Sequence, residues 1–67
     1  MGVKNNLKEI RMREYMMSQR QFADYLSVGI TTYCNWEKNL SRPTLEKALE
    51  ISEKINTNIK DIWYLEQ

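Results

Sequence analysis

The chain has 67 residues, of which 42% are apolar and 28% are charged, a composition typical of one small soluble domain. One cysteine and no histidine exclude an intramolecular disulfide, the usual structural zinc sites and catalytic arrangements that need an imidazole. The apolar runs are too short for a transmembrane helix or a signal peptide. We therefore expect a cytoplasmic protein that is not an enzyme, with no metal, cofactor or membrane partner and, for lack of a second domain, no small-molecule effector.

The formal net charge is only +1, but it is unevenly distributed along the chain. Residues 1–42 contain seven basic and four acidic side chains, whereas residues 43–67 contain three basic and five acidic ones. The first part therefore carries +3 and the remainder −2. A polyanion is expected to meet the first two thirds of the chain, although charge scatter on a solvated surface often produces such a difference.

The first predicted helix begins after Asn6, because Glu9 follows this N-cap candidate at capping-box spacing. Leu7 and Ile10 lie at helical separation behind it, and the helix is expected to end near Tyr15.

The second predicted helix has the stronger start signal. Ser18 and Gln21 form a capping box, and Met17 and Phe22 are spaced to form a hydrophobic staple across it. The helix is expected to stop near Leu26. Its inward face is predicted to consist of Phe22, Ala23 and Leu26.

The third predicted helix starts at Gly29, with Val28 and Tyr33 in the same staple relation. Trp36 continues its apolar stripe, and Asn39 is a plausible left-handed stop. Only about three residues connect the second and third helices, so they are expected to cross steeply, as in a helix-turn-helix.

Two further helices are predicted in the last third of the chain, the first of them starting at Pro43-Thr44. The fourth is recognised by the spacing of Leu45, Ala48, Leu49, Ser52 and Ile55, and Asn56 can end it. The fifth starts at Asn58 with Asp61 and carries Ile59, Ile62, Trp63 and Leu65, its last turn either fraying or continuing as a tail. The predicted fold is therefore all-α, a compact five-helix domain spanning residues 1–67 with a helix-turn-helix formed by helices 2 and 3.

Three stretches resemble the lambda-repressor and Cro-like helix-turn-helix family, also called XRE. Residues 18–23 (Ser-Gln-Arg-Gln-Phe-Ala) resemble the family's Ser/Thr-Gln-x-x-Leu-Ala start. Trp36-Glu37, with Pro43 six residues later, resembles the apolar-Glu-Asn-Gly-x-x-x-Pro stretch, and the apolar positions from Pro43 to Ile62 are similar to the fourth and fifth helices. The resemblance covers Leu7 to Trp63 and implies a transcriptional regulator that binds double-stranded DNA, most often as a repressor.

The sequence departs from the family pattern at three places. Ser27 stands where the turn glycine is usual, and Asn39 stands at the glycine after Glu-Asn, so a slightly altered turn is expected. The pair Ile10-Arg11 resembles the family's Leu-Arg pair but lies one residue further from Gln19, which predicts a longer first connection. Either Arg11 or Arg13 is then placed to pair with Glu37.

The predicted DNA-reading surface lies on the third helix. With Tyr33 and Trp36 facing inward, the outward residues that can read bases, which are also those the resemblance assigns to base reading, are Ile30, Thr31, Thr32 and Asn35. Asn35 can bind adenine in bidentate fashion, the threonines can bond bases or phosphates, and Ile30 can cover a thymine methyl group. Without the family register, the polar members would be interpreted as a solvated helix face. The neighbouring Cys34 is expected to be a passive thiol.

Four residues are predicted to contact the DNA backbone. Gln19 can bind a phosphate together with its backbone amide, because it lies at the N-terminus of the second helix. The nearby positive charges are Arg20, Lys38 and Arg42.

The C-terminal apolar residues suggest a partner chain. Ile59, Trp63, Tyr64 and Leu65 cannot all be buried by one short helix, so they form either a dimer interface or a local lid over the core. A homodimer would read a near-palindromic site with half-sites about 34 Å apart. The alternative function is a protein-interaction module, such as an antitoxin-like or adaptor domain, which the weak net charge favours.

Overall fold

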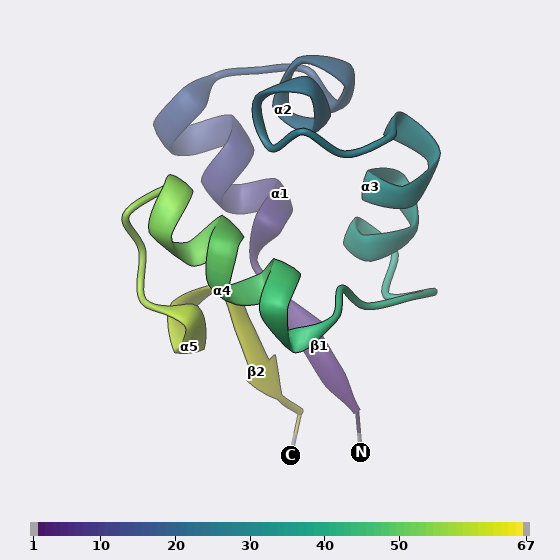
Figure 1. Ribbon diagram of the computed structural model, residues 1–67, viewed down its shortest axis with the longest axis vertical. Coiled ribbons are helices and arrows are strands. Elements are labelled where there is room, and N and C mark those ends of the chain that lie inside the picture. The colour runs from purple at the N-terminus through teal and green to yellow at the C-terminus, as the bar shows by residue number, and fades with distance from the viewer. Residues whose placement is uncertain (1, 67) are drawn as a thin grey trace.

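The computed structural model describes residues 2–66 and combines short helices with a small antiparallel sheet at the end of the molecule that carries both termini (Figure 1). In chain order the elements are β1 (Val3–Asn5), α1 (Leu7–Ile10), the π-helical segment η1 (Arg11–Tyr15), α2 (Gln19–Tyr25), α3 (Ile30–Glu37), α4 (Leu45–Lys54), α5 (Ile59–Ile62) and β2 (Trp63–Leu65). Five α-helices are confirmed for the described residues, but the all-α expectation is wrong because of the sheet. Over residues 2–66, no helix combines the length and apolarity needed to cross a lipid bilayer.

The sheet pairs the two ends of the chain. Val3 lies opposite Leu65, Lys4 opposite Tyr64 and Asn5 opposite Trp63. The last predicted helix is accordingly too long: it ends at Ile62, and Trp63 is extended, with φ −119° and ψ 135°. Strand pairing satisfies backbone groups that a frayed helical turn would leave to water, which explains the difference.

The helix starts follow the predicted caps, with one exception. At α2 both bonds of the capping box form: Gln21 N–H donates to Ser18 Oγ at 3.1 Å and Ser18 N–H donates to Gln21 Oε1 at 2.9 Å. At α1 the capping side chain is Asn5 rather than the predicted Asn6, because Asn5 Oδ1 accepts the Leu7 N–H at 3.1 Å. The starts of α4 and α5 are confirmed, with Thr44 and Asn58 as the capping side chains.

The segment between Ile10-Arg11 and Gln19 is one residue longer than the family pattern. The structure places this extra residue inside a helix and not in a longer loop. Residues Arg11–Tyr15 form a π-helical segment, and the chain leaves it through Met16 in the left-handed conformation, with φ 51°. A π turn holds one more residue than an α turn. The expected longer connection is therefore corrected: the end near Tyr15 is confirmed, and the wider turn accommodates the extra residue.

Left-handed residues end the next three helices. Ser27 follows α2 with φ 62°, Asn39 follows α3 with φ 63° and Asn56 follows α4 with φ 52°. The two asparagine stops are confirmed. Ser27 adopts the backbone conformation for which glycine is usual, so the turn keeps its left-handed geometry at an energetic cost to serine.

The core is built from one face of each helix. Its buried members are Leu7, Ile10, Phe22, Ala23, Leu26, Tyr33, Trp36, Ala48, Ile51, Ile55 and Ile62. On α4 the inward face differs from the predicted stripe: Ile51 is buried, whereas Leu45 and Leu49 are exposed. The amphipathic period was recognised, but its phase was misjudged by part of a turn.

Candidate nucleic-acid interface

Aromatic packing fixes α3 against α2. Tyr33 and Trp36 are buried, as predicted, and the Tyr33 ring meets the Phe22 ring edge-on with centroids 5.6 Å apart. Ala23 is fully buried in the same cluster. Since neither aromatic ring is presented to solvent, they support the helix and are not platforms on which nucleic-acid bases could stack.

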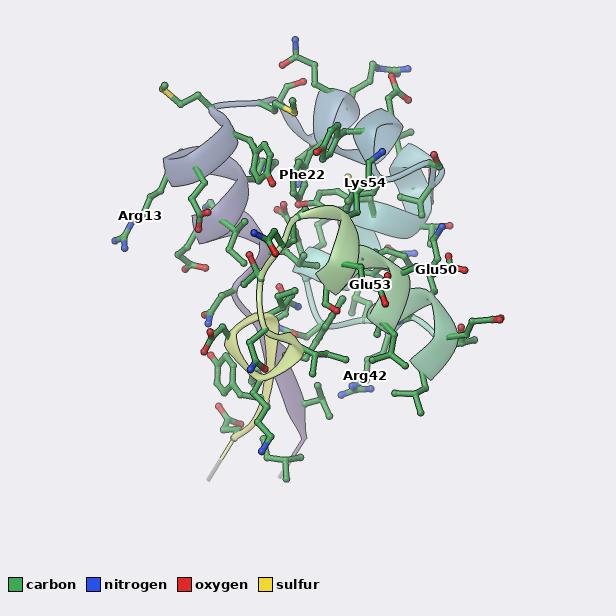
Figure 2. The ribbon with its side chains drawn as sticks, turned by 60° about the vertical axis from the view of Figure 1, so that its left-hand side comes forward. Arg13, Phe22, Arg42, Glu50, Glu53 and Lys54 are labelled. Carbon is green, nitrogen blue, oxygen red and sulfur yellow. The ribbon has the colours of Figure 1, made fainter. Side chains whose placement is uncertain are left out.

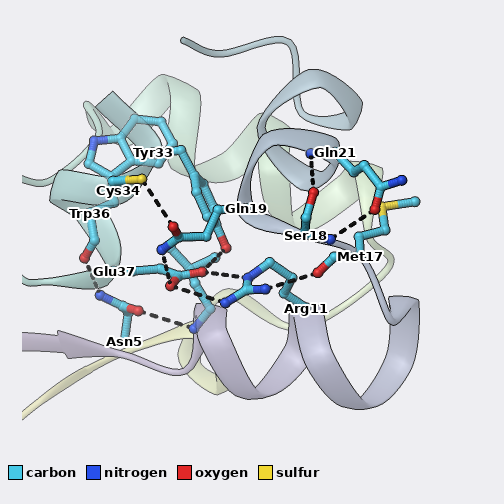
Figure 3. Close-up of polar contacts among 11 residues, drawn as sticks. Asn5, Arg11, Met17, Ser18, Gln19, Gln21, Tyr33, Cys34, Trp36 and Glu37 are labelled. Carbon is cyan, nitrogen blue, oxygen red and sulfur yellow. Dashed lines mark hydrogen bonds and ion pairs between the residues drawn. The ribbon is translucent and has the colours of Figure 1, made fainter. Parts of the chain in front are cut away.

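A buried polar cluster around Glu37, here called the Glu37 network, joins η1, α2 and α3 (Figure 3). Its members are Arg11, Gln19, Tyr33 and Glu37. The Arg11 guanidinium donates to Glu37 Oε2 at 2.9 Å and to Met17 O at 2.9 Å, Gln19 Nε2 donates to Glu37 Oε1 at 3.0 Å, and the Tyr33 hydroxyl donates to Glu37 Oε2. The open choice of partner for Glu37 is thus settled in favour of Arg11.

Charge and burial compete at this cluster. The side chains of Arg11 and Glu37 are only 11% and 5% exposed. Burial alone would raise the pKa of the Glu37 carboxyl, but hydrogen bonds from Arg11, Tyr33 and Gln19 outweigh it and hold the pKa below its ordinary value. Burial and the bond to Glu37 raise the pKa of Tyr33. Glu37 therefore stays ionised at neutral pH as the acceptor that three elements share.

Gln19 is occupied within the protein. Besides donating to Glu37, its side-chain oxygen accepts from Cys34 Sγ at 3.4 Å, so the amide connects α2 to the outward side of α3. The predicted phosphate contact therefore has the remaining amide hydrogen of Gln19 and its backbone N–H as donors. Cys34 is half-buried, and its thiol has a role in this contact that the sequence did not indicate.

The C-terminal end of α3 is tied to the sheet by Asn5. Asn5 Nδ2 donates to Trp36 O at 2.6 Å and to Asn39 Oδ1 at 3.0 Å (Figure 3 draws the first of these). The same side chain caps α1. Sequence reasoning missed this residue, although a pair of asparagines before a helix is the signal that could have indicated it.

The structure places the four predicted base-reading residues on one helix but exposes them unequally. Thr31 and Thr32 are exposed, and Asn35 is half-buried. Ile30 is also half-buried and packs against the core, so its predicted outward position is only partly correct. Its place in the first turn of α3 lets it cover the edge of the core while part of its side chain remains accessible.

The predicted backbone-contacting cations are exposed but come from separate elements. Arg20 lies on α2, Lys38 follows α3, and Arg42 precedes α4. Arg42 lies beside the sheet, with its Nη2 3.5 Å from the position that a Cβ on Gly2 would take. Figure 2 shows the Arg42 side chain at the start of α4 and the exposed Arg13 side chain projecting away from η1.

A family model for helix-turn-helix proteins matches residues 7–62, nearly the whole chain. The chain belongs to this family, of the lambda-repressor and Cro-like type. It is therefore a DNA-binding helix-turn-helix regulator, and the family is regulatory and typically non-enzymatic. Among proteins with curated functions, none matches the chain.

The C-terminal residues of this helix-turn-helix protein are only partly covered. Ile59 and Trp63 are half-buried, whereas Tyr64 is 44% and Leu65 is 72% exposed. With Val3 and Lys60, these four residues line a shallow groove of about 490 Å³. Ile59 and Trp63 therefore act as a lid over the core, whereas Tyr64 and Leu65 remain exposed beside it.

Proposed function

We propose that this protein represses transcription by binding a near-palindromic DNA site as a homodimer, with α2 and α3 as the helix-turn-helix and α3 in the major groove. The observation that carries the proposal is the contrast between the two sides of α3. Tyr33, Trp36 and Glu37 anchor it from within, while Thr31 and Thr32 remain exposed on its N-terminal half. A rigid helix with accessible polar side chains in its first turns is the geometry used for direct readout.

Base reading is assigned to Ile30, Thr31, Thr32 and Asn35. Asn35 recognises adenine through its amide, the threonine hydroxyls bind base edges or phosphates, and the accessible part of Ile30 contacts a thymine methyl group. The exposure of the threonines and the partial exposure of Asn35 support these roles.

Backbone contacts are assigned to Gln19, Arg20, Lys38 and Arg42. All three cations are exposed, and the first turn of α2 starts with Gln19. Such contacts fix the position of the protein on the duplex and contribute affinity that depends on salt concentration, but they carry no sequence information.

The homodimer interface is assigned to Ile59, Trp63, Tyr64 and Leu65, with residues 1–67 acting as one domain. Two copies related by a two-fold axis would place their α3 helices in major grooves about 34 Å apart, one turn of DNA. The exposure of Tyr64 and Leu65 supports this assignment.

Selection of bound duplexes from a random library tests the proposal directly. We expect enrichment of two inverted half-sites with centres about 10 base pairs apart. A variant carrying Thr31→Ala and Thr32→Ala serves as the control and should enrich a motif that has lost its preference at the base pairs that the threonines read, while keeping its helical circular dichroism. Failure of the wild-type protein to enrich any motif would contradict sequence-specific binding.

A protein-interaction module is the second candidate. The exposed apolar residues Tyr64 and Leu65, together with a net charge of only +1, favour it. A mobility-shift experiment with random duplexes at low salt separates the two functions. A DNA-binding protein retards the duplexes through its phosphate contacts, whereas an interaction module leaves their mobility unchanged.

A further inference from the structure

We propose that two copies of the chain join edge to edge through β2, so that their two-stranded sheets form one four-stranded antiparallel sheet with a two-fold axis at Tyr64. This inference rests on the homodimer of the proposed function and names the contact that makes it. It replaces a general apolar patch with a defined register of backbone hydrogen bonds.

The backbone pattern shows which groups β2 presents outward. Glu66 N–H donates to Gly2 O and Asn6 N–H donates to Ile62 O, both at 2.8 Å. Hydrogen-bonded pairs alternate with non-bonded pairs in an antiparallel ladder, so Lys4 and Tyr64 form the bonded pair between these two. The backbone groups of Trp63 and Leu65 therefore point to the outer edge of β2. An exposed edge of this kind is a template for another strand.

One register uses these outward groups symmetrically. Trp63 N–H already donates to Ile59 O at the end of α5, which leaves Leu65 N–H as the outward donor and Trp63 C=O as its acceptor. Antiparallel pairing of two β2 strands about Tyr64 aligns Leu65 of each copy with Trp63 of the other, giving two equivalent bonds. The Tyr64 residues then face each other as a non-bonded pair, an arrangement in which aromatic side chains stabilise each other.

The side chains beside this edge suit a second copy. The groove of about 490 Å³ next to β2 is lined by apolar residues and one cation, Lys60. Glu66, with a side chain 56% exposed, lies at the other end of the strand and forms an ion pair with Lys4 of its own chain at 4.0 Å. Antiparallel pairing carries Glu66 of each copy toward the α5 end of its partner, where Lys60 lies. The pairing therefore adds a second cation beside Glu66, so the edge is complementary to itself in charge.

The apolar surface extends beyond the strand. A second groove of about 280 Å³ shares Val3, Ile59 and Trp63 with the first and continues to Leu45 and Arg42. A stable interface buries about 800 Å² on each partner, roughly a sixth of the 4756 Å² accessible surface of this chain. That requirement exceeds one strand, and the apolar residues of the two grooves, without Arg42, provide the surface next to it.

The arrangement also leaves α3 accessible. Asn5 connects β1 to the C-terminal end of α3, so β1 lies between α3 and the outer edge of β2. The chain measures 30 × 23 × 23 Å. Two copies joined at β2 can therefore present their α3 helices at the separation of about 34 Å that adjacent major grooves require.

Disulfide trapping tests the register. In a Cys34→Ser background, Tyr64→Cys places two thiols across the two-fold axis at a Cα separation of about 4.5 Å, within disulfide range. The matched control is Lys4→Cys, the register partner of Tyr64 on the same face of the sheet. Its two copies would lie three strand spacings apart, about 14 Å, beyond disulfide range. We expect a covalent dimer on mild oxidation of Tyr64→Cys only; equal dimer from both variants, or from neither, overturns the proposal.

A second pair of variants tests the backbone bond itself in the reduced protein. Leu65→Pro removes the outward donor of β2, whereas Leu65→Ala shortens the same side chain and keeps the N–H. We expect sedimentation to show a dimer at least tenfold weaker for Leu65→Pro than for Leu65→Ala, and equal dissociation constants would mean that the backbone bond does not form. Truncation after Asp61 is a poorer test because it also removes Ile62, which is fully buried.

DNA binding separates this inference from the function on which it rests. If the wild-type protein enriches paired half-sites but Tyr64→Cys does not cross-link, the DNA-binding function stands and the β2 interface is wrong. If Tyr64→Cys cross-links and no duplex is retarded at low salt, the interface stands and the DNA-binding proposal is wrong.

Discussion

Two ends of this molecule are held together in different ways. At one end, the Glu37 network joins η1, α2 and α3 through polar side chains, of which the charged pair Arg11 and Glu37 is almost fully buried. At the other end, β1 and β2 are joined by backbone hydrogen bonds, and Tyr64 and Leu65 remain exposed. Side-chain networks need particular residues at particular places, whereas strand pairing can be extended by any strand of suitable register.

The difference suits the two tasks proposed for these ends. A helix that reads base edges must be held in one orientation, because a small displacement breaks a bidentate hydrogen bond. A contact that assembles two identical copies requires instead a surface that is complementary to itself. The anchored end is therefore expected to respond sharply to single polar substitutions, while the sheet end responds mainly through its effect on dimerisation.

Glu37→Ala should have the largest effect on stability. It leaves Arg11, Gln19 and Tyr33 without their shared acceptor, and loss of one partner of a buried ion pair lowers the free energy of unfolding by about 3–5 kcal/mol. The control is Glu50→Ala, which removes an exposed pair with Lys47 at 3.7 Å and should cost less than about 1 kcal/mol. Urea denaturation measures both, and similar losses would mean that the Glu37 network does not distinguish this end of the molecule.

Acid should weaken the same end selectively. Because the folded pKa of Glu37 lies below its ordinary value of 4.5, the folded state releases this proton more readily than the unfolded chain does. The contribution of Glu37 to the free energy of unfolding is therefore complete above pH 4.5. It is lost as the pH falls through the lower pKa of the folded state. Urea denaturation between pH 6 and pH 3 should show a smaller decrease for Glu37→Gln than for the wild-type protein. Equal decreases would place the acid sensitivity elsewhere.

The anchored end was largely predictable from the sequence and the sheet end was not. The capping box of Ser18 and Gln21 is a local signal, complete within four residues, so the start of α2 could be predicted. The strands are three residues each and lie at opposite ends of the chain. Their pairing depends on tertiary proximity, and the apolar residues after Ile62 suit a helix and a strand equally well.

Within the candidate site, the sequence predicts which residues of α3 are buried but not which side chains form hydrogen bonds between separate elements. Tyr33 and Trp36 were recognised as core because they follow the apolar period of α3. The choice between Arg11 and Arg13 remained open: the two residues lie about 200° apart on an α-helix, and the π-helical segment changes which of them faces Glu37. The links from Gln19 to Cys34 and from Asn5 to Trp36 connect separate elements, so no local pattern reveals them.

Asn35→Ala tests whether the anchoring serves base recognition. Loss of a bidentate contact should weaken binding to the selected site by about 1–3 kcal/mol, or roughly five- to 150-fold, and relax the preference at one base pair. Fluorescence anisotropy on the selected duplex and on its single-base variants measures both quantities. Equal weakening on every duplex would assign Asn35 to the backbone, as is expected of the control Lys38→Ala.

Arg42→Ala tests whether the sheet end also contributes to DNA binding, because Arg42 lies beside Gly2 and lines the groove with Trp63. We expect weaker binding on all sequences and a salt slope smaller in magnitude by about one unit, as for one lost phosphate contact. Arg13→Ala is the matched control, since Arg13 projects away from η1 (Figure 2), and should leave the slope unchanged. An unchanged slope for Arg42→Ala would remove the sheet end from the DNA contact.

Ser27→Gly should produce the smallest effect, and a stabilising one. Ser27 has φ 62° in the turn between α2 and α3, a conformation that costs a residue other than glycine about 1–2 kcal/mol. Glycine offsets part of this gain by about 0.5–1 kcal/mol of extra entropy in the unfolded chain, which leaves a net gain of about 0.5 kcal/mol. For a domain of this size that gain raises the Tm by about 2–4 °C.

The control for this turn is Ser41→Gly, where φ is not positive and the substitution should lower the Tm through the unfolded chain alone. Opposite changes in Tm would show that Ser27 pays a conformational cost to hold the turn. Equal decreases would mean that the turn relaxes around Ser27, and the orientation of α3 would then depend on the Glu37 network and its aromatic packing without help from the turn.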